Sequence, residues 1–73
     1  MRLLDVEIGH KVRVVGFEGS GLNSRLLRVG VYPGDEMTVM RRAPIGGPLL
    51  VSVGGREMAL GRRVAARIRV EEL

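Results

Sequence analysis

The sequence contains no cysteine and only two aromatic residues, Phe17 and Tyr32. Small secreted domains usually depend on disulfides, so the lack of cysteine leads us to expect a cytoplasmic protein. With so few rings, the hydrophobic core is expected to be aliphatic. The same scarcity argues against nucleic-acid binding, because sequence-tolerant single-strand binders built on small barrels stack bases on aromatic side chains.

Long hydrophobic runs are also missing. No stretch reaches the roughly 18 apolar residues that a membrane helix requires, so we expect no membrane insertion, and residues 1–11 lack the layout of a signal peptide. The 73 residues allow one domain at most, which we place at residues 1–73. A domain of this size buries only about 60% of the surface of its unfolded chain, which leaves little bulk for a deep catalytic cleft.

Groups that could bind metal or perform catalysis are equally sparse. His10 is the only histidine, and the carboxylates are scattered over turns and chain ends. Zinc and iron sites need several converging ligands, so we expect neither a metal site nor a cofactor. No nucleophile, base and orienting group can be assembled from these residues, so we expect that the protein is not an enzyme.

Positive charge is plentiful. The formal net charge is +4 and the chain has 12 basic residues, of which only Lys11 is a lysine. A basic domain of this kind can meet nucleic acid, an anionic membrane surface or an acidic protein face, and the charge alone does not choose among them.

The first half of the chain predicts a strand, a short helix and a tight corner. Residues 11–17 alternate at strand period, and Asn23 or Ser24 is expected to cap a following helix that carries Leu26 and Leu27. Gly30 has the position of a left-handed residue that ends a helix.

The corner continues into a second strand. Pro33 and Gly34 suit the two central positions of a type II turn, which directs the chain into a strand over residues 36–43. Since Tyr32 precedes a proline, its backbone is expected to be extended.

The second half contains a clear hairpin signal. Gly54 and Gly55 separate two apolar runs, as in a two-residue primed turn. This turn sets a register in which Val53 faces Arg56 and Leu49 faces Leu60. One or two helical turns and a closing strand over residues 68–73 follow. Short strands with tight turns predict a mainly β fold, a small SH3-like antiparallel barrel with one or two short helices; an OB-type barrel is the competing fold.

Several segments match the pattern of one known family. The central segment, residues 25–51, is similar to a signature in which Arg-Leu-Leu and Gly precede Pro-Gly, and Arg-Arg-Ala-Pro follows. Residues 59–70 and the spacing of Leu3, Val6 and Gly9 match its closing and opening segments. The chain therefore resembles the ferrous-iron transport protein A (FeoA) family over nearly its whole length.

The resemblance implies an SH3-like barrel that acts as a cytosolic accessory to bacterial ferrous-iron uptake. The partner it implies is a membrane ferrous-iron permease with a cytosolic GTPase domain. Two alternatives remain open: a basic nucleic-acid-binding barrel, and a regulatory SH3-like domain related to iron-dependent repressors.

Candidate partner-binding residues lie in and after the corner. Tyrosine and arginine often dominate binding energy at protein interfaces, so we assign partner binding to Leu27, Tyr32, Arg41 and Arg42. Because exposed charges contribute little to stability, we expect that charge reversal at both arginines would leave the fold intact.

Overall fold

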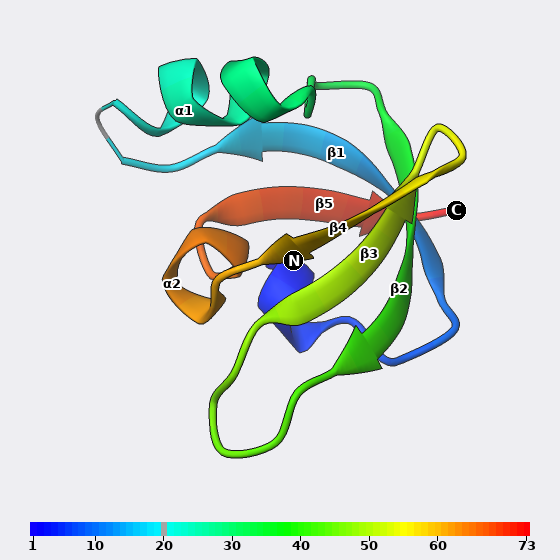
Figure 1. Ribbon diagram of the computed structural model, residues 1–73. Helices are drawn as coiled ribbons and strands as arrows, with labels where there is room; N and C mark the ends of the chain where they lie inside the picture. The colour runs from blue at the N-terminus through cyan, green and yellow to red at the C-terminus, as the bar shows by residue number, and fades with distance from the viewer. Residues whose placement is uncertain (20) are drawn as a thin grey trace.

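The computed structural model describes residues 1–19 and 21–73 and consists mainly of short strands (Figure 1). A 3₁₀ helix, η1, precedes the first strand, and two α-helices interrupt the strand order. In chain order the elements are η1 (Leu3–Asp5), β1 (Lys11–Phe17), α1 (Leu22–Val29), β2 (Glu36–Arg42), β3 (Leu49–Val53), β4 (Arg56–Leu60), α2 (Arg62–Ala65) and β5 (Ile68–Glu72).

The five strands form one antiparallel sheet in the order β4-β3-β2-β1-β5. The sheet is strongly curved, and α1 lies across β1 while α2 lies beside β5 (Figure 1). Shifts in register between Val14 and Gly16 and between Val39 and Arg41 mark bulges, which increase strand twist and so help a small sheet to curl around its core. The prediction of a mainly β fold with short helices is confirmed.

The core is aliphatic, as the scarcity of aromatic residues predicts. Val12 and Val14 of β1 and Met37 and Val39 of β2 point inward and are almost completely buried. The remaining buried side chains come from η1 and the residue that follows it, from the two α-helices, from the segment after α1 and from the other strands: Leu3, Val6, Leu26, Val31, Leu49, Val51, Val53, Leu60, Ala65, Ile68 and Val70. Phe17 only packs against the margin of this cluster.

The hairpin between β3 and β4 has the predicted register. Val53 pairs with Arg56 and Leu49 pairs with Leu60. Gly54 and Gly55 have φ values of 56° and 81°, which is the left-handed conformation that a type I′ turn requires at both central positions.

The end of α1 also follows the prediction. Gly30 has φ 92°, and its N–H bonds the Leu27 carbonyl while the Val31 N–H bonds the Leu26 carbonyl. These two bonds form a Schellman motif, in which a left-handed residue lets the chain satisfy the last helical carbonyls. Val31 and Leu26 both belong to the buried core.

The start of α1 differs from the prediction. We expected Asn23 or Ser24 to cap the helix, but the helix already begins at Leu22, and the residue before it, Gly21, is left-handed with φ 79° and makes no side-chain cap bond. The capping prediction is therefore wrong: the glycine turns the chain into the helix without a side-chain acceptor.

The segment before β1 was recognised only through the family resemblance. It forms η1, whose Leu3 is fully buried, and Val6 follows it into the core.

Within residues 1–19 and 21–73, no helix is long and apolar enough to cross a membrane.

Candidate functional site

Leu27 and Tyr32 lie together on the corner between α1 and β2. The Tyr32 hydroxyl is 3.5 Å from the Leu27 carbonyl oxygen, a long hydrogen bond. The two residues are 41% and 50% exposed, although large apolar side chains are usually buried. The corner therefore presents a small apolar surface with a hydroxyl at its edge.

Main-chain hydrogen bonds hold the corner rigidly against β1. The Tyr32 N–H donates to the Asp35 carboxylate at 2.8 Å, and the Asp35 N–H donates to the Tyr32 carbonyl at 3.0 Å. The Gly34 N–H bonds the Val14 carbonyl, and the Val14 N–H bonds the Asp35 carbonyl. Gly34 has φ 96°, as the third residue of a type II turn requires. A pre-formed surface such as this one loses little entropy on binding.

An open hollow of about 670 Å³ lies next to the corner. The corner forms one wall and the β3–β4 hairpin turn forms the other, and both lie at the same end of the sheet (Figure 1). Its lining is mixed in polarity and charge: Lys11, Gly30, Tyr32, Asp35, Glu36, Thr38, Ser52, Val53, Gly54, Gly55 and Arg56. Such a hollow suits a polar peptide segment better than an apolar small molecule.

Arg56 crosses from the hairpin to the end of α1. Its Nη2 atom lies 2.6 Å from the position that a Cβ on Gly30 would occupy. The guanidinium thus sits at the C-terminal end of a helix, where a positive charge is favourable. Sequence reasoning missed this residue, because its contact depends on the pairing of β2 with β3 and leaves no local signal.

Arg41 and Arg42 lie at the opposite end of β2. At about 3.3 Å per residue, β2 carries the chain roughly 20 Å from Glu36, next to the corner, to Arg42. The structure therefore brings Leu27 and Tyr32 together but does not place the two arginines on the same surface. The assignment of these residues to partner binding remains a prediction, and the corner and the arginines must be tested separately.

Arg42 has a structural role that the sequence did not reveal. Its Nη1 donates to the Leu4 carbonyl at 2.6 Å and its Nη2 donates to the Val6 carbonyl at 2.6 Å. These carbonyls lie at the C-terminal end of η1, where helical carbonyls lack intrahelical partners. The expectation that charge reversal at both arginines would leave the fold intact is therefore not supported for Arg42.

Charge pairs cover the outer face of β1 and its neighbours. Lys11 and Arg13 both reach Glu36 at 3.5 Å, and Arg13 also reaches Glu71 at 3.4 Å. At the start of the chain, a hydrogen bond with Arg2 holds the pKa of the Asp5 carboxyl below its usual value, and the same bond raises the pKa of Arg2. All of these side chains are partly exposed, so each pair contributes little alone.

The only histidine has carboxylates on both sides of its ring. His10 Nε2 is 3.8 Å from Glu7 and Nδ1 is 3.5 Å from Glu72. The carboxylates therefore approach different nitrogens and do not converge on one point. Among residues 1–19 and 21–73, no group of three or more metal-binding side chains is present.

Comparison with known proteins identifies the family. The FeoA domain matches residues 1–72. The chain is 33% identical over 72 residues to the "Fe(2+) transport protein A/Fe(2+) transporter FeoB fusion protein" of Porphyromonas gingivalis, and this match covers 97% of the chain but only 8% of the fusion protein.

Two solved structures are similar over nearly all of the chain. Iron(II) transport protein A from Clostridium thermocellum is 34% identical with a TM-score of 0.91, over 100% of this chain and 46% of that one. Stenotrophomonas maltophilia FeoA, described as an SH3 domain protein complexed with zinc, is 28% identical with a TM-score of 0.81, over 97% and 89% of the two chains. The SH3-like prediction is thus confirmed.

Proposed function

This chain belongs to the FeoA family, and from that premise we propose that it is a cytosolic accessory protein of bacterial ferrous-iron uptake. Residues 1–73 act as a single domain that binds the GTPase-bearing iron permease and regulates it without catalysing a reaction. The observation that carries this proposal is the fusion protein of P. gingivalis, which joins a homologous domain to a transporter in one chain. Fusion raises the effective concentration of one partner near the other, so it supports a working contact between the two.

The corner provides the chemistry for such a contact. A rigid turn holds Tyr32 and Leu27 partly exposed, and the neighbouring hollow offers main-chain and charged groups for a polar segment of the partner. Aromatic side chains at the centre of protein interfaces often contribute most of the binding energy. We therefore assign the centre of the interface to Tyr32, with Leu27 beside it.

Co-purification tests this proposal directly. The tagged protein is mixed with the detergent-solubilised permease, with and without a guanine nucleotide, and the complex is isolated by size exclusion. We expect a stoichiometric complex in at least one nucleotide state. Failure to form a complex in any nucleotide state would refute the proposed function.

A further inference from the structure

A strained apolar residue stands at the tip of the loop between β2 and β3. Ile45 has φ 58°, which is an outlier for a β-branched residue, and its side chain is fully exposed. Two hydrogen bonds close the loop behind it: Gly47 N–H to the Pro44 carbonyl and Ala43 N–H to the Pro48 carbonyl. Strain that is kept at the surface is typical of positions that serve binding.

Arginine side chains lie directly beside this tip. The Nη1 atom of Arg62 is 2.9 Å from the position that a Cβ on Gly46 would occupy. Next to it lies a hollow of about 250 Å³ that is lined by three arginines and one carboxylate, together with small residues of the loop and Leu4: Arg2, Leu4, Asp5, Arg42, Ala43, Gly46, Gly47 and Arg62. The lining of this hollow therefore carries a net positive charge.

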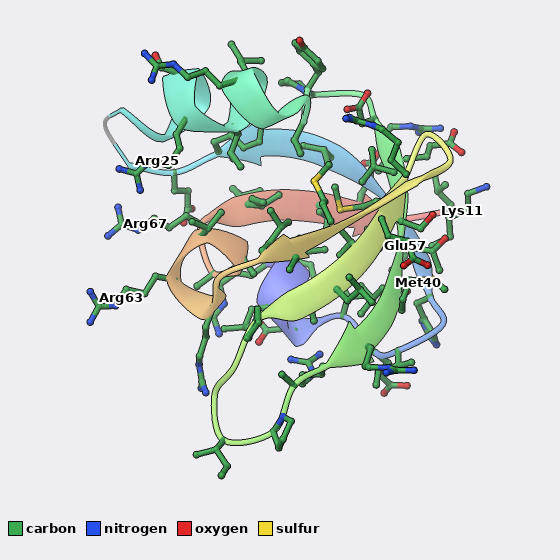
Figure 2. The ribbon with its side chains drawn as sticks, viewed as in Figure 1. Lys11, Arg25, Met40, Glu57, Arg63 and Arg67 are labelled. Atoms are coloured by element: carbon green, nitrogen blue, oxygen red, sulfur yellow. The ribbon has the colours of Figure 1, made fainter. Side chains whose placement is uncertain are left out.

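The positive surface continues along one edge of the molecule. Arg63 follows Arg62 in α2, and Arg67 packs its guanidinium against Gly19, shortly before α1. Figure 2 shows Arg63, Arg67 and Arg25 along the same edge, with their side chains directed outward. We call Arg25, Arg62, Arg63 and Arg67 the basic edge.

The arginines of the basic edge form no ion pairs with the carboxylates of the described residues. Among the described residues, every ion pair within 4.0 Å involves Arg2, His10, Lys11, Arg13 or Arg69, and none involves the basic edge. Lys11 and Glu57 lie on the opposite side of the molecule (Figure 2). Arginines without an ion-pair partner in the described part of the chain thus run from Arg62, beside the apolar tip, along this edge to Arg25.

We propose that the basic edge and Ile45 dock on an anionic lipid surface. Arginines near such a surface are attracted by lipid phosphates, and an exposed apolar side chain gains by entering the boundary between headgroups and acyl chains. Nucleic acid offers phosphates but no apolar layer for Ile45, and the aromatic residue near the edge, Phe17, packs against the core and so is poorly placed to stack bases. This docking goes beyond the proposed function and does not require the permease, since lipid alone supplies both contacts.

Vesicle sedimentation tests the docking without any partner protein. The full chain is mixed with vesicles of phosphatidylcholine and phosphatidylglycerol, or of phosphatidylcholine alone. We expect binding only to the anionic vesicles, with an affinity that falls as salt is added. Arg63→Gln should weaken partitioning about fivefold, the effect of one basic residue near an anionic surface.

Two variants separate this docking from general effects of charge or folding. Lys11→Gln removes one positive charge from the opposite side and should change partitioning less than about twofold. Ile45→Gly relieves the backbone strain, so it should not lower the melting temperature, yet it should weaken partitioning by roughly threefold or more.

Three results would overturn the proposal. The first is that the protein does not bind anionic vesicles. The second is that Arg63→Gln and Lys11→Gln lose partitioning equally, and the third is that Ile45→Gly partitions like the wild type. Retention on an acidic polypeptide or on single-stranded DNA without vesicle binding would reassign the basic edge to that class of partner.

Discussion

The guanidinium of Arg42, the last residue of β2, donates a 2.6 Å hydrogen bond to the main-chain oxygen of Leu4 in η1. A second bond of the same length reaches the Val6 carbonyl. The side chain of Arg42 thus connects β2 to η1. It holds η1 against the core, where Leu3 and Val6 are buried.

Replacing Arg42 should therefore destabilise the fold. Arg42→Met keeps most of the aliphatic stem but removes both charge-assisted hydrogen bonds, so we expect a loss of about 1.5 kcal/mol in the free energy of unfolding. Urea denaturation measures it. Arg41→Met is the matched control, since no hydrogen bond of the Arg41 side chain is found among the described residues, and it should change stability by less than about 0.5 kcal/mol. Equal stability of the two variants would contradict the structural role of Arg42.

Gly30 should not tolerate a β-branched residue. Its φ of 92° is strained for any residue with a Cβ, and the guanidinium of Arg56 occupies the space beside it. We expect Gly30→Val to cost about 1–3 kcal/mol, which for a domain of this size lowers the melting temperature by at least about 4 °C.

Gly16→Val is the control for that experiment. Gly16 lacks positive φ and has open space where a Cβ would stand, so this variant should melt close to the wild type. An unchanged melting temperature of Gly30→Val would mean that α1 does not depend on a left-handed residue at its end.

The Arg2–Asp5 pair should make a small, pH-dependent contribution to stability. Because the pKa of Asp5 is lower in the folded protein than its ordinary value of 3.8, the contribution is present above that value and is lost as the pH falls through the folded pKa. The urea midpoint of the wild type should therefore fall more steeply below pH 3.8 than that of Asp5→Asn.

High salt should reduce the difference between the two proteins, since both side chains are about half exposed and exposed pairs are screened. Parallel pH profiles at low salt would show that the pair contributes nothing.

Ferrous iron should not bind tightly to this chain. His10 is the only histidine, and its two neighbouring carboxylates approach different ring nitrogens. Anaerobic calorimetry should show only weak binding, which His10→Ala leaves unchanged. A stoichiometric site with submicromolar affinity would contradict this expectation.

Two features built from neighbouring residues could be predicted from the sequence. The β3–β4 hairpin follows from Gly54-Gly55 and the apolar pattern on both sides, and the end of α1 follows from Gly30. Both depend on backbone conformations that glycine adopts more readily than other residues, so the residue type itself reveals the structure.

Contacts between distant segments could not be predicted in the same way. Arg42 and Leu4 are 38 residues apart, and Arg56 reaches Gly30 only after β3 has paired with β2. The same limit separates the candidate site residues: a seven-residue strand carries the chain from the corner with Tyr32 to Arg41 and Arg42 at the other end of the sheet.

The claim that the corner binds the permease is tested most directly by measuring the affinity of the purified protein for the cytosolic part of the permease. Tyr32 is half exposed on a rigid corner, so Tyr32→Ala should raise the Kd at least about tenfold with little change in the melting temperature. Val15→Ala removes an exposed apolar side chain from β1 and should leave the Kd within about twofold of the wild type. Equal affinities of wild type and Tyr32→Ala, with both proteins folded, would contradict the assignment of the corner as the partner-binding surface.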